Sequence, residues 1–233
     1  MNAQMHIADE RPQDFKTAIT GFCIAVVFGI AFGYIEAAVV VYLREIFYTG
    51  GFVFPLEIAN GNPLWKRLLL TEIGREAATL VIITTAAMLF GKNLRQRIAY
   101  FLIIFAIWDI FYYIWLKVLL DWPASIMDWD ILFLIPMPWA GPVLAPVLIS
   151  AVMFLLAVII LYYDYRHRTI GLTIFDYSAL FLGGVIIIGS FCIAGLHSSR
   201  ENYRDYFYWM LFAAGLLPAV AVFVRRVKVK KSK

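Results

Sequence analysis

The sequence predicts an all-α fold, a polytopic membrane bundle of about six transmembrane helices. Of its 233 residues, 63% are hydrophobic and only 15% are charged, whereas soluble domains are about 45–50% apolar and about 25% charged. Too few polar groups remain to cover a water-exposed surface. The composition therefore excludes a soluble enzyme, a disordered chain and a nucleic-acid-binding domain, and the net charge of +4 needs no nucleic acid to explain it.

Six stretches reach the length of about 20 mostly apolar residues that a transmembrane helix needs. They are Thr17–Leu43, Leu68–Phe90, Ala99–Leu120, Val143–Tyr163, Tyr177–His197 and Tyr206–Val224. The first is too long for a cleaved signal peptide, and no small-residue cleavage site follows it. We expect one transmembrane domain over residues 17–224, with an N-terminal tail over 1–16 and a basic C-terminal tail over 225–233.

The distribution of basic residues predicts the orientation of the chain. Six spans place both termini on one side, and most of the 20 Lys and Arg residues fall on that side. Because Lys and Arg are retained on the cytoplasmic side, we expect a multi-pass protein of the cell (inner) membrane with both termini in the cytoplasm.

The segment between the third and fourth spans is rich in proline and tryptophan. Five prolines and three tryptophans lie between Asp121 and Pro146, and proline at this density prevents a continuous helix. We expect a re-entrant or interfacial segment, with a half-helix near Trp129–Pro138 that forms the lid or wall of a pocket. A plain interfacial loop is the alternative.

Five ionisable side chains fall inside the spans, where each costs roughly 2.5–3.5 kcal/mol on the insertion scale. They are Glu36, Glu72, Arg75, Glu76 and Asp109. At about 1.5 Å per residue, Glu36, Glu76 and Asp109 all lie roughly 12–14 Å inside the basic residue at the same end of their spans. Three helices thus bring carboxyl groups to one level in the non-cytoplasmic half of the membrane.

Helical spacing also groups these residues by face. Glu72, Arg75 and Glu76 are spaced i, i+3, i+4 and share one face of the second span. The first span carries Gly29 and Gly33 on the face that continues to Glu36. Small residues at this spacing let another helix approach closely, which would turn Glu36 into the bundle.

The third span repeats this arrangement, because Asp109, Tyr112, Tyr113 and Lys117 lie on one face. Two interpretations of the charges stay open. In the structural one, Arg75 bridges Glu36 or Asp109 and locks three helices in register. In the functional one, a carboxyl group without a matching positive charge takes up a proton and carries it or donates it to a ligand.

The leading hypothesis is a multi-pass membrane protein, a subunit of a larger membrane complex, with a charged pocket that handles protons or an amphiphilic ligand such as a quinol or lipid. The carboxyl groups would handle the proton or ligand, the basic residues would balance charge or bind an anionic group, and the aromatic residues would stack on or hydrogen-bond the ligand. The residues concerned are Glu36, Glu72, Glu76, Asp109, Arg75, Arg44, Lys117, Tyr112, Tyr113 and Trp108.

Three other functions stay open: an enzyme acting on lipid-linked substrates, a proton-coupled transporter, and a purely structural membrane subunit. The sequence does not decide whether the protein is an enzyme. Its two cysteines and three histidines do not form a metal or haem motif, and no cofactor is evident, although a bound lipid or quinone fits the hypothesis. We expect membrane lipids and other membrane subunits as partners, and no nucleic acid.

Overall fold

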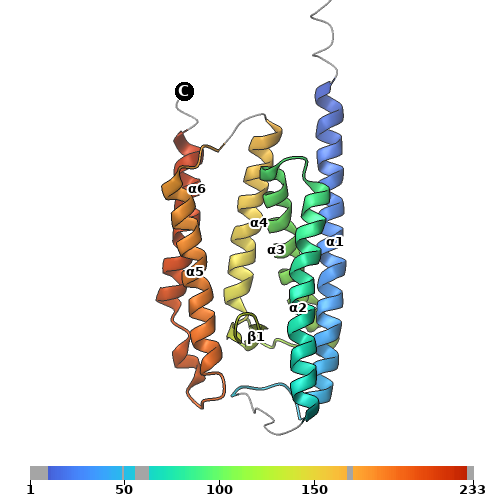
Figure 1. Ribbon diagram of the computed structural model, residues 1–233, viewed down its shortest axis with the longest axis vertical. Helices are drawn as coiled ribbons and strands as arrows, with labels where there is room; N and C mark the ends of the chain where they lie inside the picture. The colour runs from blue at the N-terminus through green and yellow to red at the C-terminus, as the bar shows by residue number, and fades with distance from the viewer. Residues whose placement is uncertain (1–9, 49, 56–62, 167–169, 230–233) are drawn as a thin grey trace, which may run out of the picture.

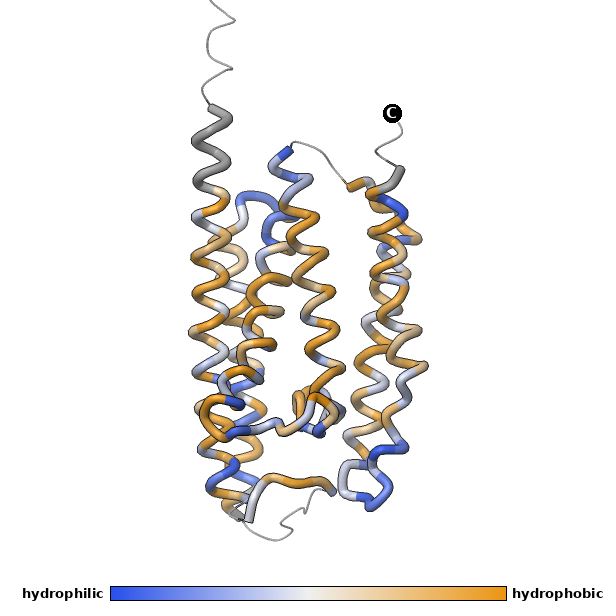
Figure 2. Tube along the Cα trace, turned by 180° about the vertical axis from the view of Figure 1, so that it is seen from behind, coloured by the Kyte–Doolittle hydropathy of each residue, from blue (hydrophilic) through white to orange (hydrophobic). Residues whose placement is uncertain are grey.

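The computed structural model describes residues 10–48, 50–55, 63–166 and 170–229, and it confirms the predicted bundle of six long helices (Figure 1). All six are long and apolar enough to cross a membrane. The helices are α1 (Glu10–Phe47), α2 (Pro63–Phe90), α3 (Leu94–Leu120), α4 (Leu144–Tyr165), α5 (Ile174–Leu196) and α6 (Trp209–Val229). Apolar residues dominate the middle of each helix and polar residues gather at the ends (Figure 2).

The helices extend beyond the apolar stretches that predict them. Helix α1 already begins at Glu10, although its membrane-spanning part begins at Ala18. Helix α2 begins at Pro63, whose fixed φ and missing N–H suit the first position of a helix. Most of the expected tail 1–16, loop residues 56–62 and the end of the basic tail lie outside the described residues. The start of that basic tail is still helical, since α6 continues to Val229.

The prediction of a half-helix near Trp129–Pro138 is wrong, because this segment belongs to a β-hairpin. Strand β1 (Trp129–Phe133) pairs antiparallel with β2 (Trp139–Pro142), with an irregularity in register after Ile131. Prolines remove the donors that a helix needs, whereas the aromatic and β-branched residues of β1 favour a strand. Pairing of the two strands satisfies backbone groups that would otherwise need water or side chains.

Helix α3 is the central helix, in contact with α1, α2 and α4. In its most apolar window 44% of residues are buried, compared with 28% in each of the other spans. The close approach expected at Gly29 and Gly33 is confirmed. A Cβ atom at Gly33 would lie 2.8 Å from the carbonyl oxygen of Trp108, and one at Gly29 would lie 2.8 Å from the side chain of Ile107.

Helices α5 and α6 form a pair that stands apart from the other four (Figure 1). The two helices meet at glycines, since a Cβ atom at Gly183 would lie 2.5 Å from the carbonyl oxygen of Gly215. The end of α5 rests on β2, where Gly195 packs against the backbone of Pro138. Helix α6 makes few contacts with α4. The hairpin therefore attaches the α5–α6 pair to the bundle at one end.

Candidate functional site

Arg75, Glu36 and Glu72 form one compact ionic cluster between α1 and α2. Both terminal nitrogens of Arg75 reach the carboxylate of Glu36, at 2.5 and 2.6 Å. Its Nε donates to Glu72 at 2.9 Å, one turn away on the same helix. Such forked contacts are the strongest hydrogen bonds that arginine makes. Arg75 thus links α2 to α1 through Glu36, as the structural interpretation requires. Its contacts among the described residues do not include Asp109, so it does not link α3.

Glu76 lies on the same face of α2 but contacts the hairpin instead. Its carboxylate accepts a hydrogen bond of 2.9 Å from the backbone N–H of Leu134, which directly follows β1. The side chain is buried, with an exposed fraction of 6% for the residue. A carboxyl group that satisfies a backbone donor holds the hairpin against α2.

Arg44 belongs to a second buried ion pair that sequence reasoning missed. Its Nη2 donates to Asp130 of β1 at 3.0 Å, and the hydroxyl of Tyr112 donates to the other oxygen of Asp130 at 3.1 Å. The guanidinium group lies between two rings, 4.1 Å from the centroid of Phe52 and 3.8 Å from that of Trp122. These contacts join α1, α3 and β1 with the segments that follow α1 and α3.

The sequence pattern does not mark Asp130 as a buried residue, because it lies between two spans, where a charged side chain is normally exposed to water. In the structure it is only 2% exposed. The available signal was its position, since it is the last charge before the uncharged stretch 131–163 and lies next to Trp129. An acidic residue inside an apolar loop often has a buried partner.

Two further predicted residues lie at the edge of these groups. Tyr113 is buried, and its ring contacts the ring of Tyr112 at a centroid distance of 4.8 Å. Lys117 is half-exposed and pairs with Asp121 just beyond the end of α3, at 2.7 Å. This ammonium group lowers the pKa of the exposed Asp121 carboxyl below its ordinary value. Lys117 therefore does not join the buried carboxyl groups.

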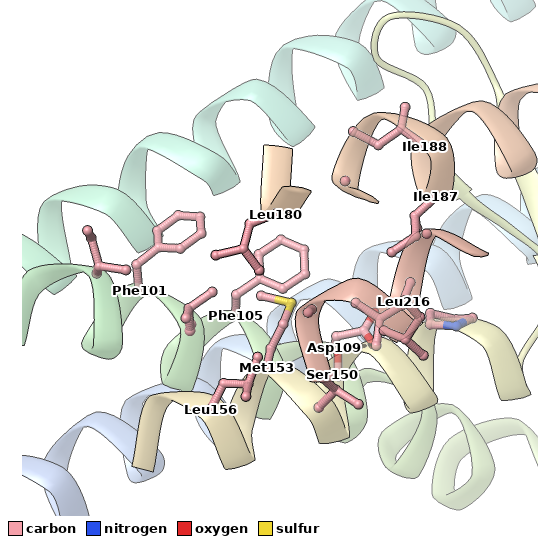
Figure 3. Close-up of a pocket in the computed structure, with 18 of the residues that line it drawn as sticks. Phe101, Phe105, Asp109, Ser150, Met153, Leu156, Leu180, Ile187, Ile188 and Leu216 are labelled. Carbon is pink, nitrogen blue, oxygen red and sulfur yellow. Dashed lines mark hydrogen bonds between the residues drawn. The ribbon is translucent and has the colours of Figure 1, made fainter. Parts of the chain in front are cut away.

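Asp109 does not belong to the ionic cluster but lines a cavity, together with Ser150 (Figure 3). Its Oδ2 accepts a hydrogen bond of 2.8 Å from the hydroxyl of Ser150 on α4, a residue that is 1% exposed. In the part of the chain that the structure describes, no Lys, Arg or His lies within ion-pair distance of Asp109. Of the predicted carboxyl groups, Asp109 is the one with a neutral partner and an adjoining open space.

The cavity holds about 670 Å³ and lies between α3, α4, α5, α6 and the hairpin. This volume is within the range of about 300–1,000 Å³ that small-molecule sites occupy. Its wall on α3 runs from Arg95 to Asp109, which is about 21 Å along the helix. The wall between these two residues is made of aliphatic and aromatic side chains from four helices. Labelled examples in Figure 3 are Phe101, Phe105, Met153, Leu156, Leu180 and Ile187.

Two tryptophans of the wall have buried indole nitrogens. That of Trp108 lies toward the carboxylate of Glu36, whereas that of Trp139 makes no hydrogen bond with any residue that the structure describes. Trp139 lies at the hairpin end of the cavity, with its ring parallel to that of Phe191. Buried donors without partners are rare in proteins, so this end of the cavity has an unused capacity for hydrogen bonding.

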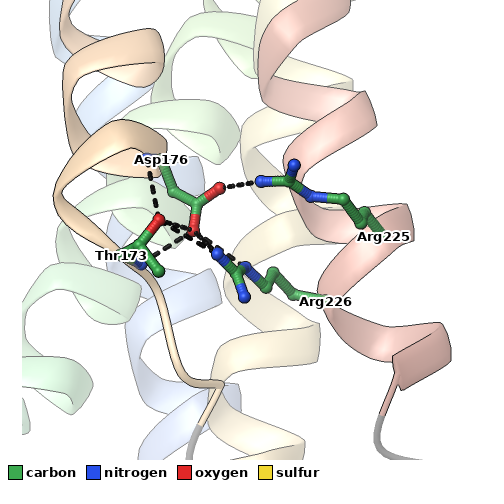
Figure 4. Close-up of polar contacts among 4 residues, drawn as sticks. All are labelled: Thr173, Asp176, Arg225 and Arg226. Atoms are coloured by element: carbon green, nitrogen blue, oxygen red, sulfur yellow. Dashed lines mark hydrogen bonds and ion pairs between the residues drawn. The ribbon is translucent and has the colours of Figure 1, made fainter.

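At the opposite end of the bundle, Asp176 binds two arginines of α6 (Figure 4). Arg225 and Arg226 both contact its carboxylate, and Arg226 also donates to the hydroxyl of Thr173 at 3.0 Å. Thr173 and Asp176 form a capping box at the start of α5. A threonine followed three residues later by an acidic residue is a pattern that predicts such a helix start. This cluster fastens the ends of α5 and α6 together.

The fold defines a multi-pass membrane protein. Comparisons with protein-family models, with curated proteins and with solved structures find no match to this chain. Among the described residues, no group of three or more His, Cys, Asp and Glu side chains is placed to hold a metal ion. The polar groups that line the cavity near the hairpin include the carboxyl group of Asp109, the hydroxyl of Ser150 and the indole donor of Trp139.

Proposed function

We propose that this membrane protein binds an amphiphilic small molecule, such as a quinol or a lipid, in the cavity between α3, α4, α5 and α6. The observation that carries the proposal is the position of Asp109. It lies in the wall of a large apolar cavity and has a serine hydroxyl, not a cation, as its hydrogen-bonding partner. Ionisable groups at such positions are costly in a membrane and usually functional.

The polar end of the ligand would supply the binding energy. Hydrocarbon chains are as well solvated by lipid as by an apolar cavity, so the chain adds little driving force. A hydroxyl group that donates to Asp109 completes the hydrogen bonding of a buried carboxyl group, which is worth about 1.5–3 kcal/mol when the acceptor is charged. The indole donor of Trp139 offers a further contact at the same end.

The other predicted site residues support the protein framework in this proposal. Arg75 is saturated by Glu36 and Glu72, Glu76 binds the hairpin, and Arg44 binds Asp130. These contacts favour a second candidate function, a purely structural membrane subunit. In that case the cavity would hold bulk lipid without selection, and the protein would act only through the partners that it holds.

We also propose that both termini face the cytoplasm. Helix α1 begins and α6 ends at the same end of the bundle (Figure 1). That end carries Arg95, Arg97, Arg225 and Arg226, and basic residues are retained on the cytoplasmic side. The hairpin and the Asp109 end of the cavity would then lie in the outer half of the membrane.

The test is to purify the protein in mild detergent and identify bound small molecules by native mass spectrometry. We expect a stoichiometric ligand in the wild type and its loss in Gly184→Leu. Gly184 lines the cavity and has open space at its Cβ position, so a leucine side chain there is expected to occupy part of the cavity. Gly189→Leu is the matched control, since Gly189 has the same open space on α5 but does not line the cavity.

Asp109→Asn then tests the polar end of the site. It keeps the size of the side chain but removes the negative charge, and we expect weaker retention of the ligand with an unchanged helical spectrum. The contrary result is an unselected mixture of lipids in the wild type that Gly184→Leu and Asp109→Asn retain equally well. It would favour the structural subunit and contradict the binding of a selected ligand.

A further inference from the structure

A second, smaller hollow lies beside the cavity on the lipid-facing side of the protein. It is a groove of about 360 Å³ between α4 and α6. The groove and the cavity share three wall residues, Val152, Leu156 and Phe223, so the two spaces adjoin. Phe223 is only 5% exposed and lies where they meet. There is room for this groove because α4 and α6 make few contacts with each other.

We propose that this groove is a lateral portal, through which the ligand of the cavity enters from the hydrocarbon of the bilayer. The inference rests on the proposed function. All residues that line the groove are aliphatic or aromatic. Leu155 is 61% exposed and Val224 is 48% exposed, as expected for side chains that face lipid chains. A molecule already dissolved in the bilayer therefore meets no polar barrier on this route.

The portal also narrows the chemical class of the ligand. A charged phosphate headgroup would lose its hydration in the groove, and no polar side chain in the lining would replace it. At the polar end of the cavity it would meet the carboxyl group of Asp109. Arg95 also lines the cavity, but about 21 Å away along α3, and it already pairs with Asp164 at 3.9 Å. The ligand class is thus a lipid-phase molecule with an uncharged, hydroxyl-bearing head and a hydrocarbon chain, such as a prenyl quinol, and phospholipids are excluded.

The hinge for such entry lies at the hairpin end. There α5 rests on β2, with Gly195 against Pro138 and Gly141 against Phe191. Closely packed backbones leave little freedom of movement at this end. Along the α4 face, by contrast, the α5–α6 pair is separated from the bundle by the cavity and the groove. A small rotation of the ring of Phe223 would connect the two spaces.

The rate of ligand entry tests the portal separately from binding itself. Protein in lipid vesicles of phosphatidylethanolamine and phosphatidylglycerol receives either a 13C-labelled prenyl quinol or 13C-labelled phosphatidylglycerol, and native mass spectrometry follows the labelled adduct over time. The variant is Val220→Trp, because Val220 lines only the groove. The control is Val185→Trp, since Val185 is exposed on α5 and lines neither space.

We expect the quinol to load the wild type and phosphatidylglycerol not to load it. Val220→Trp fills the groove with a bulky ring, so we expect loading to slow roughly tenfold or more, whereas final occupancy stays at the wild-type value. Phe223→Ala removes the ring between the spaces and is expected to speed loading.

The outcomes separate the two proposals. Loading of Val220→Trp at the wild-type rate, with normal final occupancy, overturns the portal and leaves the binding site intact. Loading of phosphatidylglycerol as fast as the quinol overturns the proposed ligand class. Absence of both labelled adducts from the wild type overturns the uncharged-head ligand class and the portal. If the purified wild type also carries no native ligand, the proposed function fails as well.

Discussion

Two carboxyl groups that the sequence predicts to lie at one level of the membrane have opposite surroundings. Glu36 on α1 receives two hydrogen bonds from Arg75, which itself is held by Glu72. Asp109 on α3 receives one from Ser150 and adjoins a cavity. The first group is already paired with a cation inside the protein, whereas the second has only a neutral partner. Depth alone therefore does not identify a functional acid, because what matters is whether a partner inside the protein has already satisfied it.

The largest expected effect comes from breaking the saturated cluster. Arg75→Met leaves Glu36 and Glu72 buried without a counter-charge, and removal of one partner of a buried pair costs about 3–5 kcal/mol. We expect a strongly reduced melting temperature in detergent. The triple variant Arg75→Met, Glu36→Gln, Glu72→Gln should recover most of the loss. A melting temperature of Arg75→Met equal to that of the wild type would show that the cluster does not hold α1 to α2.

The packing that aligns the two acids is the next target. Gly33→Ala places a methyl group 2.8 Å from the backbone of α3, and overpacking of this kind costs about 1–3 kcal/mol. Thermal melting should show the loss. Gly74→Ala on α2 is the matched control, since a Cβ atom there meets no other atom within 4 Å. Equal melting temperatures for the two variants would contradict a close contact between α1 and α3.

Asp109→Asn sharpens the comparison because it should affect binding more than stability. The asparagine keeps the contact with Ser150, so we expect a change in the free energy of unfolding of less than about 1 kcal/mol, as for most replacements that do not break a buried network. Ligand affinity should fall by about tenfold, since the hydrogen bond to a charged acceptor is lost. Titration of the purified variant with a prenyl quinol measures the affinity, and thermal melting measures the change in stability. Unchanged affinity would remove Asp109 from the binding site.

The smallest effect is expected at Lys117. It pairs with the fully exposed Asp121, and exposed ion pairs are weak because water screens them. Lys117→Gln should leave both the melting temperature and ligand retention at wild-type values. A loss of ligand in this variant would place Lys117 in the site, as the sequence alone suggested.

Part of this arrangement was predictable from local sequence. The number and order of the spans follow from hydropathy. The level expected for Glu36, Glu76 and Asp109 rests on the rise of a helix and stays a prediction. The close approach at Gly29 and Gly33 followed as well, because a missing side chain permits it whatever the partner is. For the same reason, the i, i+3 spacing of Glu72 and Arg75 was enough to predict that they share a face.

The sequence by itself determined that this chain is a six-helix membrane bundle with five ionisable residues inside its spans. Only the tertiary structure decided which of these residues already have a charged partner inside the protein. The rotation of each helix about its axis depends on all its neighbours, so it is not encoded in local spacing. The burial of Asp130 and the pairing of β1 with β2 likewise join residues from separate segments. The cavity beside Asp109 exists because α5 and α6 attach through the hairpin, a contact that no single segment contains.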